Sequence, residues 1–382
     1  MASCASFVSQ QSDVKLMARE LAASSGAELP RFGFVSCTAG VDVEGLRTAL
    51  AAALPRVPFI GVTSCRAVIG DGKLARGPVA ASVLWLLGDD VRASVVGQPI
   101  AVADESRGQQ LGQKALSALG SEGSFAVLHA TPGTEEPLLR GLAKALGKTP
   151  LLGGSAADDT IEGRWSVFTH DARYPAGAVL AVVKWPGKAL APWISGAMPA
   201  KQKAVVTKAE GRTIQELDGK PAALVYNEWL GGALTEALTS GEQILSKTTL
   251  SPLGVVRPSG ITLVHPERIV GGKALASFAE VNVGETVALV RSTTLAMQGR
   301  PTNLVARAMA EAGLSELKAA FLVYCAGCML AIDPATGAMV DALKTVTRKA
   351  PLMGAFYFGE QGCHSPGVPE HGNLMTAVLL LG

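Results

Sequence analysis

Apolar runs and amphipathic segments alternate along this chain in a pattern that repeats. Residues 31–37 (RFGFVSC) and 57–64 (VPFIGVTS) are short apolar runs, which are typical of buried strands. Between them, residues 42–54 carry apolar side chains at helical spacing. Connections this short predict two parallel strands joined by a right-handed helical crossover. We therefore expect a βαβ unit here.

Two further copies of this unit follow. The second copy spans residues 124–156, and a third, looser copy spans residues 319–360. In all three copies the second strand opens with a Pro-x-x-Gly motif, at Pro58, Pro150 and Pro351. Additional strand-like runs lie at residues 79–87, 91–96, 178–185, 260–265 and 285–291. The pattern predicts an α/β fold in which repeated βαβ-like units are combined with added antiparallel strands in mixed sheets.

The regions outside the copies predict an N-terminal helix and a domain boundary. Apolar residues near helical spacing predict a helix over residues 9–25. Farther on, Asp218-Gly219 is a turn signal, and Pro221 suits the first turn of a following helix. We therefore expect a boundary near residue 219, which divides the chain into an N-terminal extension (1–30), a first module (31–219) and a second module (220–382).

Composition excludes several classes of protein. Hydrophobic residues make up 48% and charged residues 17% of the 382 residues, which is typical of a globular chain with a large core. A net charge of +2 gives no electrostatic footprint for nucleic acid. Apolar stretches stop at about ten residues, whereas a membrane-spanning helix needs roughly 20. With six scattered cysteines and no signal peptide, we expect a cytoplasmic protein without a membrane anchor.

The carboxyl ends of the predicted strands are where a ligand is expected. In parallel α/β sheets, ligands gather outside these ends. They carry Ser64, Ser155, Cys325 and Glu360, which offer hydroxyls, a thiol and a carboxylate to a small polar ligand. Neither a P-loop nor a dinucleotide-binding pattern is present, and no Ser/His/Asp set is evident from order or spacing. These features favour recognition over hydrolysis.

The segment from Phe356 to Val378 gathers further polar side chains. It contains Glu360, His364 and His371, and we interpret it as a strand, a loop and a strand at the rim of the same pocket. A plain solvated loop is the alternative. A structural zinc site is disfavoured, because the adjacent Cys363 and His364 would share one tetrahedral ion awkwardly.

A Cys-x-x-Cys pair follows the first strand of the third copy. Cys325 and Cys328 match the spacing of redox motifs that open a helix. However, Asp333-Pro334 would end a helix early, so a strand end that enters a tight turn through Gly327 is the alternative. The position of Cys325 at a strand carboxyl end, where ligands gather, favours a place in the ligand pocket.

Several of these stretches resemble FIST-domain proteins. The matching segments are GRTIQELDGKPAALVY at the boundary, PFIGVTS and PLLGGSAADD in the first module, and YCAGCMLAI, PLMGAFYFGEQG and HGNLM in the second. The resemblance covers residues 30 to 382. It implies a FIST N-type and a FIST C-type module, which together act as an intracellular sensory module for small ligands such as amino acids.

The resemblance also suggests a cofactor and a partner. Some stand-alone bacterial members of the family are similar to haem proteins that sense nitric oxide and regulate a histidine kinase. Haem needs an axial ligand, and we assign His371 to that role, with His170, His265 and His364 as other histidines near strand-like or loop segments. Covalent attachment is excluded, because no C-x-x-C-H motif occurs.

These observations lead to one leading hypothesis and two alternatives. The leading hypothesis is a non-enzymatic sensor that binds a small molecule at Ser64, Ser155, Cys325, Glu360, His364 and His371 and acts on a separate signalling partner. One alternative is an enzyme with Cys325 as nucleophile, His371 as base and Glu360 as the group that orients it. The other is a pure protein-interaction scaffold.

Overall fold

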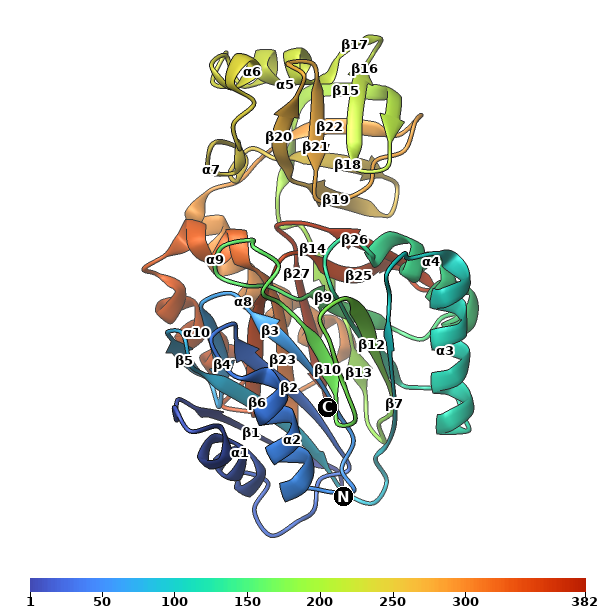
Figure 1. Cartoon of the computed structure of the whole chain (residues 1–382), viewed down its shortest axis with the longest axis vertical. Coiled ribbons are helices and arrows are strands. Elements are labelled where there is room, and N and C mark those ends of the chain that lie inside the picture. Colours follow the sequence, from blue (N-terminus) through green and yellow to red (C-terminus); the bar gives the residue numbers. More distant parts are fainter.

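A computed structural model describes all residues from Met1 to Gly382. It shows a larger body built from three mixed sheets, with a smaller β-rich unit above it (Figure 1). The N-terminus lies at the end of the larger body away from the smaller unit, and the C-terminus lies higher up in the same body (Figure 1). The α/β fold with repeated units and mixed sheets is therefore confirmed.

The three predicted βαβ units are present, and the two strands of each are parallel neighbours. Their buried strands and amphipathic helices follow the predicted segments closely. The third unit differs, because a short extra helix, α9 (Ala326–Ile332), directly follows its first strand. The units are β2 (Phe32–Thr38), α2 (Val43–Ala53) and β3 (Phe59–Ser64); β8 (Phe125–Ala130), α4 (Glu135–Leu146) and β9 (Leu151–Ser155); and β23 (Ala319–Cys325), α10 (Thr336–Val346) and β24 (Leu352–Tyr357).

Each unit donates a hairpin to the sheet of another unit. The hairpin that follows β3 pairs with β24, the one that follows β9 pairs with β3, and the one that follows β24 pairs with β9. The exchange is cyclic, so no unit completes its sheet alone. These hairpins are β4 (Ala67–Gly70) with β5 (Lys73–Arg76), β10 (Val167–Thr169) with β11 (Arg173–Tyr174), and β25 (Glu360–Ser365) with β26 (Val368–Gly372).

Antiparallel strands complete the other side of each sheet. The three sheets have the orders β1-β6-β2-β3-β10-β11, β26-β25-β9-β8-β12-β7 and β13-β27-β23-β24-β4-β5, with β14 also paired to β27. The added strands are β1 (Ser3–Ser9), β6 (Ala81–Leu87), β7 (Arg92–Pro99), β12 (Gly177–Lys184), β13 (Ala189–Leu190), β14 (Trp193–Ile194) and β27 (Thr376–Leu381).

Backbone hydrogen bonds tie the three units together where their second strands end. Three equivalent N–H groups, each just beyond one of these strands, donate to a carbonyl of the next unit. The bonds run from Cys65 to Phe356 (3.0 Å), from Ala157 to Thr63 (2.9 Å) and from Phe358 to Ser155 (3.2 Å). The carboxyl ends of β3, β9 and β24 therefore meet at one place.

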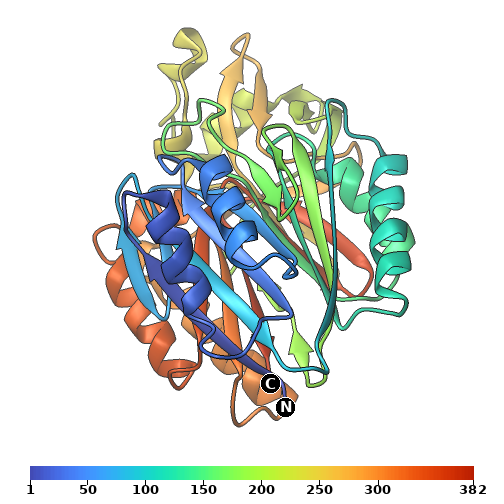
Figure 2. The same cartoon turned by 60° about the horizontal axis from the view of Figure 1, so that its bottom comes forward.

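Pairs of helices cover the outer faces of the three sheets (Figure 2). Residues along β2 and β8 alternate between two cores, as the two-residue period of a strand requires: Phe34 and Val127 face the central core, whereas Val35 and Leu128 face the helices. The remaining helices of this body are α1 (Val14–Ala23), α3 (Glu105–Leu119) and α8 (Thr294–Ala312).

The smaller unit has a separate hydrophobic core. Its strand order is β19-β18-β22-β15-β16-β21-β20, and β17 also pairs with β16. The strands are β15 (Met198–Glu210), β16 (Thr213–Leu217), β17 (Lys220–Pro221), β18 (Leu253–Arg257), β19 (Gly260–Val264), β20 (Pro266–Val270), β21 (Ala274–Ser277) and β22 (Thr286–Arg291). Its helices are α5 (Ala222–Trp229), α6 (Ala237–Ser240) and α7 (Leu245–Thr248).

Two local predictions need correction. The N-terminal helix begins at Val14 and not at Ser9, because residues 3–9 form an edge strand that pairs with β6 in the first sheet. Cys325 does not enter a simple tight turn: it caps α9, which ends before Asp333. No helix is long and apolar enough to cross a membrane.

Candidate functional site

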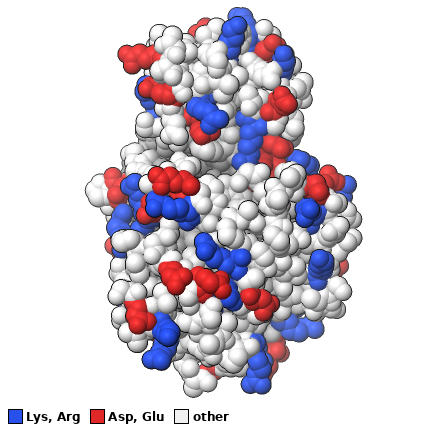
Figure 3. Space-filling model, in the orientation of Figure 1, with Lys and Arg blue, Asp and Glu red and all other residues white.

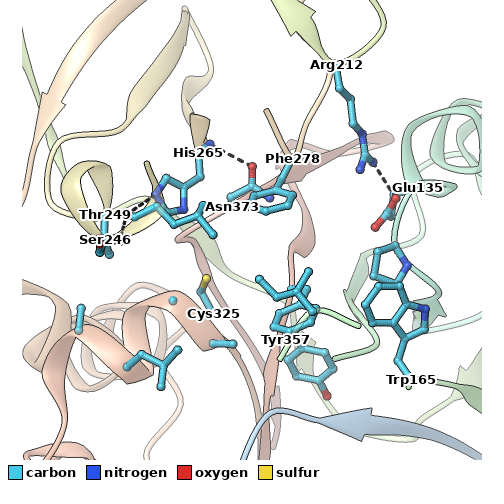
Figure 4. A pocket seen from close by; sticks show the side chains of 18 of the residues that line it. Glu135, Trp165, Arg212, Ser246, Thr249, His265, Phe278, Cys325, Tyr357 and Asn373 are labelled. Carbon is cyan, nitrogen blue, oxygen red and sulfur yellow. Dashed lines mark hydrogen bonds and ion pairs between the residues drawn. The ribbon is translucent and has the colours of Figure 1, made fainter. Parts of the chain in front are cut away.

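A cavity of about 540 Å³ lies between the smaller unit and the carboxyl ends of β8, β23 and β24. Figure 4 shows side chains from both bodies facing it, among them His265 and Phe278 above and Cys325 and Tyr357 below. The lower wall forms because the ring of backbone hydrogen bonds gathers strand ends at one place. The upper wall comes from turns between strands of the smaller unit and from α7.

His265 lies in the upper wall with a defined tautomer. Its Nε2 is 3.3 Å from the carbonyl oxygen of Leu245 and 3.0 Å from the Thr248 hydroxyl. The Thr248 hydroxyl donates to the carbonyl oxygen of Ile244 at 2.9 Å, so it accepts from Nε2, as the carbonyl of Leu245 does. We therefore assign the ring proton to Nε2, which leaves Nδ1 as an acceptor. Burial lowers the pKa of His265 to about 4, so the ring is neutral at pH 7.

Asn373 connects this wall to the lower body. Its Oδ1 accepts a hydrogen bond from the backbone N–H of His265 at 3.1 Å, which fixes the orientation of the amide. The side chain lines the cavity and the residue is only 3% exposed, yet Nδ2 has no hydrogen-bond partner. A buried donor without a partner is unfavourable unless something else accepts from it.

Cys325 forms part of the floor, and its sulfur points into the cavity (Figure 4). Burial raises the pKa of this thiol well above its usual range, and neighbouring Cys328 adds to the shift. Glu360 is fully buried next to Cys325, and its Oε2 accepts the backbone N–H of Met375 at 2.9 Å. Burial, followed by the effect of Cys325, raises the pKa of Glu360 well above its ordinary value, so a protonated carboxyl is favoured there.

An ion-paired cluster closes one end of the cavity. Arg212 from the smaller unit contacts Glu135 at 2.7 Å and Glu136 at 2.6 Å, both at the start of α4. Glu135 also accepts from the Ser155 hydroxyl at 2.5 Å and from the backbone N–H of Gly133 at 2.7 Å. Burial alone would raise the pKa of Glu135, but Arg212, His371 and the Ser155 hydroxyl together outweigh it and hold this pKa low, near 2. The carboxylate is thus ionised and fully satisfied.

Apolar side chains surround the mouth of the cavity. Ile161, Leu250 and Leu330 line it and are 41%, 38% and 44% exposed, which is unusual for large hydrophobic residues. Trp165 and Phe358 pack edge to face at 6.0 Å nearby. An apolar entrance favours a ligand with substantial apolar surface.

The predicted site residues are brought together only in part. Cys325 lines the cavity, and Glu360 lies directly behind it. Ser155 and His371 also lie behind the wall: Ser155 donates to Glu135, and His371 Nε2 is 4.0 Å from the same carboxylate. These four residues therefore lie in the same region, but only Cys325 faces the cavity.

Ser64 and His364 are not at the cavity. The Ser64 hydroxyl is a structural link, because it donates to Ala67 O at 2.6 Å and accepts from Phe356 N at 2.9 Å. His364 packs against Trp193, with ring centroids 4.6 Å apart, in a separate hollow. The reason is that the segment forms the β25–β26 hairpin, and His364 lies at its far end, away from Glu360.

The sequence analysis missed four residues of the site. Glu135 opens the predicted helix after β8, a position where a strand-end argument could have found it. Arg212, Asn373 and Phe278 carry no comparable signal, because their place depends on how the smaller unit docks. His265 appeared only as one histidine among several.

The geometry does not provide a catalytic pair for Cys325. His371 Nε2 lies 3.2 Å from the carbonyl oxygen of Phe278, and Nδ1 lies 3.1 Å from Gln361 Nε2, so both ring nitrogens are engaged elsewhere. No cluster of three His, Cys, Asp or Glu side chains is arranged to hold a metal ion.

On the surface, basic and acidic side chains are interspersed over the face shown in Figure 3. This face displays no field of a single sign.

Comparison with known proteins identifies the class. The FIST N domain family matches residues 31–220, and the FIST C domain family matches residues 222–363. The chain therefore belongs to the FIST family, whose domains are associated with sensory ligand binding in signalling proteins.

Other comparisons add little. No curated protein matches the chain. Among solved structures, cyanuric acid hydrolase from A. caulinodans aligns over 100% of both chains with 11% identity and a TM-score of 0.34, a likeness too weak to support an argument.

Proposed function

We propose that this protein is a non-enzymatic, cytoplasmic sensor that binds a small molecule in the cavity between its two bodies. Binding would change the output of a separate signalling protein, with a histidine kinase as the partner suggested by family resemblance. The observation that carries this proposal is the origin of the cavity walls. Because both bodies contribute, a bound molecule contacts both at once.

Such a molecule can favour one relative arrangement of the two bodies. A ligand shifts a conformational equilibrium only as far as it binds one state better than the other. Ion pairs join the two bodies: Arg212 pairs with Glu135 at the cavity, and Arg257 pairs with Glu370 at 2.5 Å outside it. A small displacement of the smaller unit would break or remake these ion pairs and so alter the surface that a partner meets.

The chemistry of the site supports recognition over catalysis. The Cys325 thiol is held protonated by burial, and no histidine is positioned to remove its proton. A nucleophilic cysteine needs the opposite environment, with a depressed pKa and an adjacent base.

Haem fits this cavity poorly. His371 does not line the cavity, and neither of its nitrogens is free for iron. His265 has a free Nδ1, but the only cation lining the cavity, Arg212, is already shared by two carboxylates and is not available to haem propionates. Haem-based sensing of nitric oxide would require a rearranged site, and an absorption spectrum without a Soret band is the result we expect from protein purified from haem-replete cells.

Native mass spectrometry of protein purified from its own host tests the sensor proposal. We expect a bound small molecule at one copy per chain. Leu330→Arg, which places a charge at the apolar mouth, should abolish the bound mass. The matched control is Leu295→Arg, because Leu295 is also an exposed leucine on a helix, at 77% exposure, but does not line the cavity. A chain that carries no added mass would favour the scaffold alternative and overturn the proposal.

A further inference from the structure

We propose that the cavity selects an uncharged, mainly apolar molecule that presents an amide-type edge, with a carbonyl oxygen accepting from Asn373 Nδ2 and an adjacent N–H donating to His265 Nδ1. This inference rests on the proposed function, because it names the chemical class of ligand for the same cavity. It is drawn from the hydrogen-bonding groups that the protein leaves unused.

The cavity offers no free charge to a ligand. Arg212 and Glu135 are the only charged side chains in its lining, and they neutralise each other, with Glu136 as a third member of the cluster. The Cys325 thiol and the His265 ring are neutral, since burial opposes ionisation of both. A charged ligand would be desolvated without a counter-ion, which is strongly unfavourable.

Two neighbouring residues of the cavity wall each leave one hydrogen-bonding group unused, and the two groups are of opposite type. Asn373 Oδ1 is occupied by the backbone N–H of His265, so the amide can only direct its Nδ2 donor elsewhere, and that donor has no partner. His265 donates through Nε2 to Leu245, which leaves Nδ1 as an acceptor. The hydrogen bond between the two residues holds them next to each other (Figure 4).

The Asn373 donor and the His265 acceptor would be satisfied together by a ligand that carries an acceptor next to a donor. A cis-amide edge, such as that of a lactam or an oxo-heterocycle, carries a carbonyl oxygen next to an N–H. An alcohol, an ether or a hydrocarbon satisfies one of the two groups or neither. Because a buried group left unpaired is costly, the wall discriminates against them.

The rest of the lining favours an aromatic or otherwise flat apolar body. Phe278 packs against the His265 ring at 6.4 Å, and Trp165 packs against Phe358 at 6.0 Å. With Leu250 and Leu330 at the mouth, most of a ligand of moderate size would be buried against apolar surface. The amide edge would then set its orientation.

Isothermal titration calorimetry with a matched set of probes tests this inference. The probes are 2-quinolone, which has a cis-amide edge; 1-methyl-2-quinolone, in which a methyl group replaces the N–H donor of that edge; and quinoline-2-carboxylate, which is charged. We expect 2-quinolone to bind, and each of the other two to bind at least about tenfold more weakly, as the loss of one buried hydrogen bond predicts.

Two variants test whether Asn373 and His265 bind the amide edge of the ligand. Asn373→Asp keeps the acceptor for His265 N–H but removes the donor, and His265→Gln keeps a donor in the place of Nε2 but removes Nδ1. Each variant should weaken the binding of 2-quinolone by about tenfold. Each should also reduce the preference of the cavity for 2-quinolone over 1-methyl-2-quinolone. Asn303→Asp and His170→Gln make the same changes outside the cavity and should leave binding unchanged.

The outcomes separate this inference from the proposed function. If all three probes bind equally well and Leu330→Arg abolishes their binding, the cavity is a ligand site but the amide-edge inference is wrong. If none of the probes binds, the inference is also overturned, while the mass measured on protein from its host still decides the proposed function. Because the probe comparison uses the wild-type chain, a variant that fails to fold does not remove the test.

Discussion

The buried carboxyl of Glu360 allows a quantitative prediction about pH. The residue has no exposed surface, its Oε1 has no hydrogen-bond partner, and its only hydrogen bond is accepted from Met375 N. Its pKa is raised well above 4.5, the ordinary value that it recovers in the unfolded chain. In the window between these two values, the folded state keeps the proton and the unfolded state releases it.

The sign of the effect follows from this difference in bound protons. The favourable contribution of the protonated carboxyl is fully present below pH 4.5 and is lost as pH rises towards the folded pKa. Each pH unit in that window removes about 1.4 kcal/mol from the free energy of unfolding. Glu360→Gln has nearly the same shape and does not titrate, so it escapes this loss.

Urea unfolding of wild type and Glu360→Gln at pH 5, 6 and 7 measures the difference. We expect the advantage of the variant to grow as pH rises, by up to about 1.4 kcal/mol per unit. Glu28→Gln removes one negative charge at an exposed position and is the matched control.

The opposite trend would refute the reasoning. Arg300 is buried nearby, and its Nε and Nη2 have no hydrogen-bond partners. If Glu360 is ionised and paired with Arg300 in the folded protein, the variant loses stability relative to wild type as pH rises from acid values. A difference that does not depend on pH would equally contradict a raised pKa.

Three further predictions concern stability and thiol chemistry. Arg212→Gln leaves the buried Glu135 carboxylate without its main partner, and we expect urea unfolding to show a loss of about 3 kcal/mol. Gly153→Ala places a Cβ 1.9 Å from the carbonyl oxygen of Leu128, so we expect a loss of several kcal/mol or no folded protein, measured by circular dichroism and urea unfolding. Iodoacetamide should label Cys325 slowly at pH 7 in the folded protein, measured by peptide mass mapping, because burial keeps the thiol protonated.

Each of these predictions has a control and a contradicting result. Arg307→Gln removes an exposed ion pair with Glu311 and should lower the free energy of unfolding by less than about 1 kcal/mol. An equally small loss from Arg212→Gln would show that the buried ion pair does not stabilise the fold more than an exposed one. Gly337→Ala meets nothing within 4 Å and should be tolerated, so similar damage at both glycines would exclude the steric explanation. Labelling that is fast and selective for Cys325 would instead support the alternative in which this chain is an enzyme with Cys325 as its nucleophile.

The local structure of the repeated units could be predicted from the sequence because it depends on neighbours along the chain. Apolar runs of strand length and the helical spacing of residues 135–146 are properties of short segments. The glycine of the Pro-x-x-Gly motif has a non-local physical reason: at Gly61 a Cβ would lie 2.0 Å from the Phe168 ring, and at Gly153 it would meet a backbone carbonyl. A residue without a side chain is required wherever another segment approaches this closely.

The position of the site was only partly predictable for the opposite reason. Of the residues predicted at strand ends, Cys325 lies at the cavity and Glu360 lies beside it. It could not show that Ser64 would be used to link two strands, or that the β25–β26 hairpin would carry His364 away from Glu360. Hydrogen bonds between residues far apart in the chain determine both outcomes.

The βαβ units, their parallel pairing and the family of this protein could be inferred from the amino-acid sequence, because they follow from hydrophobic periodicity and short motifs. Which unit receives each exchanged hairpin, and where the smaller unit docks, became clear from the folded chain. Docking brings Arg212, His265 and Phe278 over the strand ends, and it leaves Asn373 with an unused donor. A sequence records the periodicity of its own elements, whereas a cavity depends on contacts between elements that are distant along the chain.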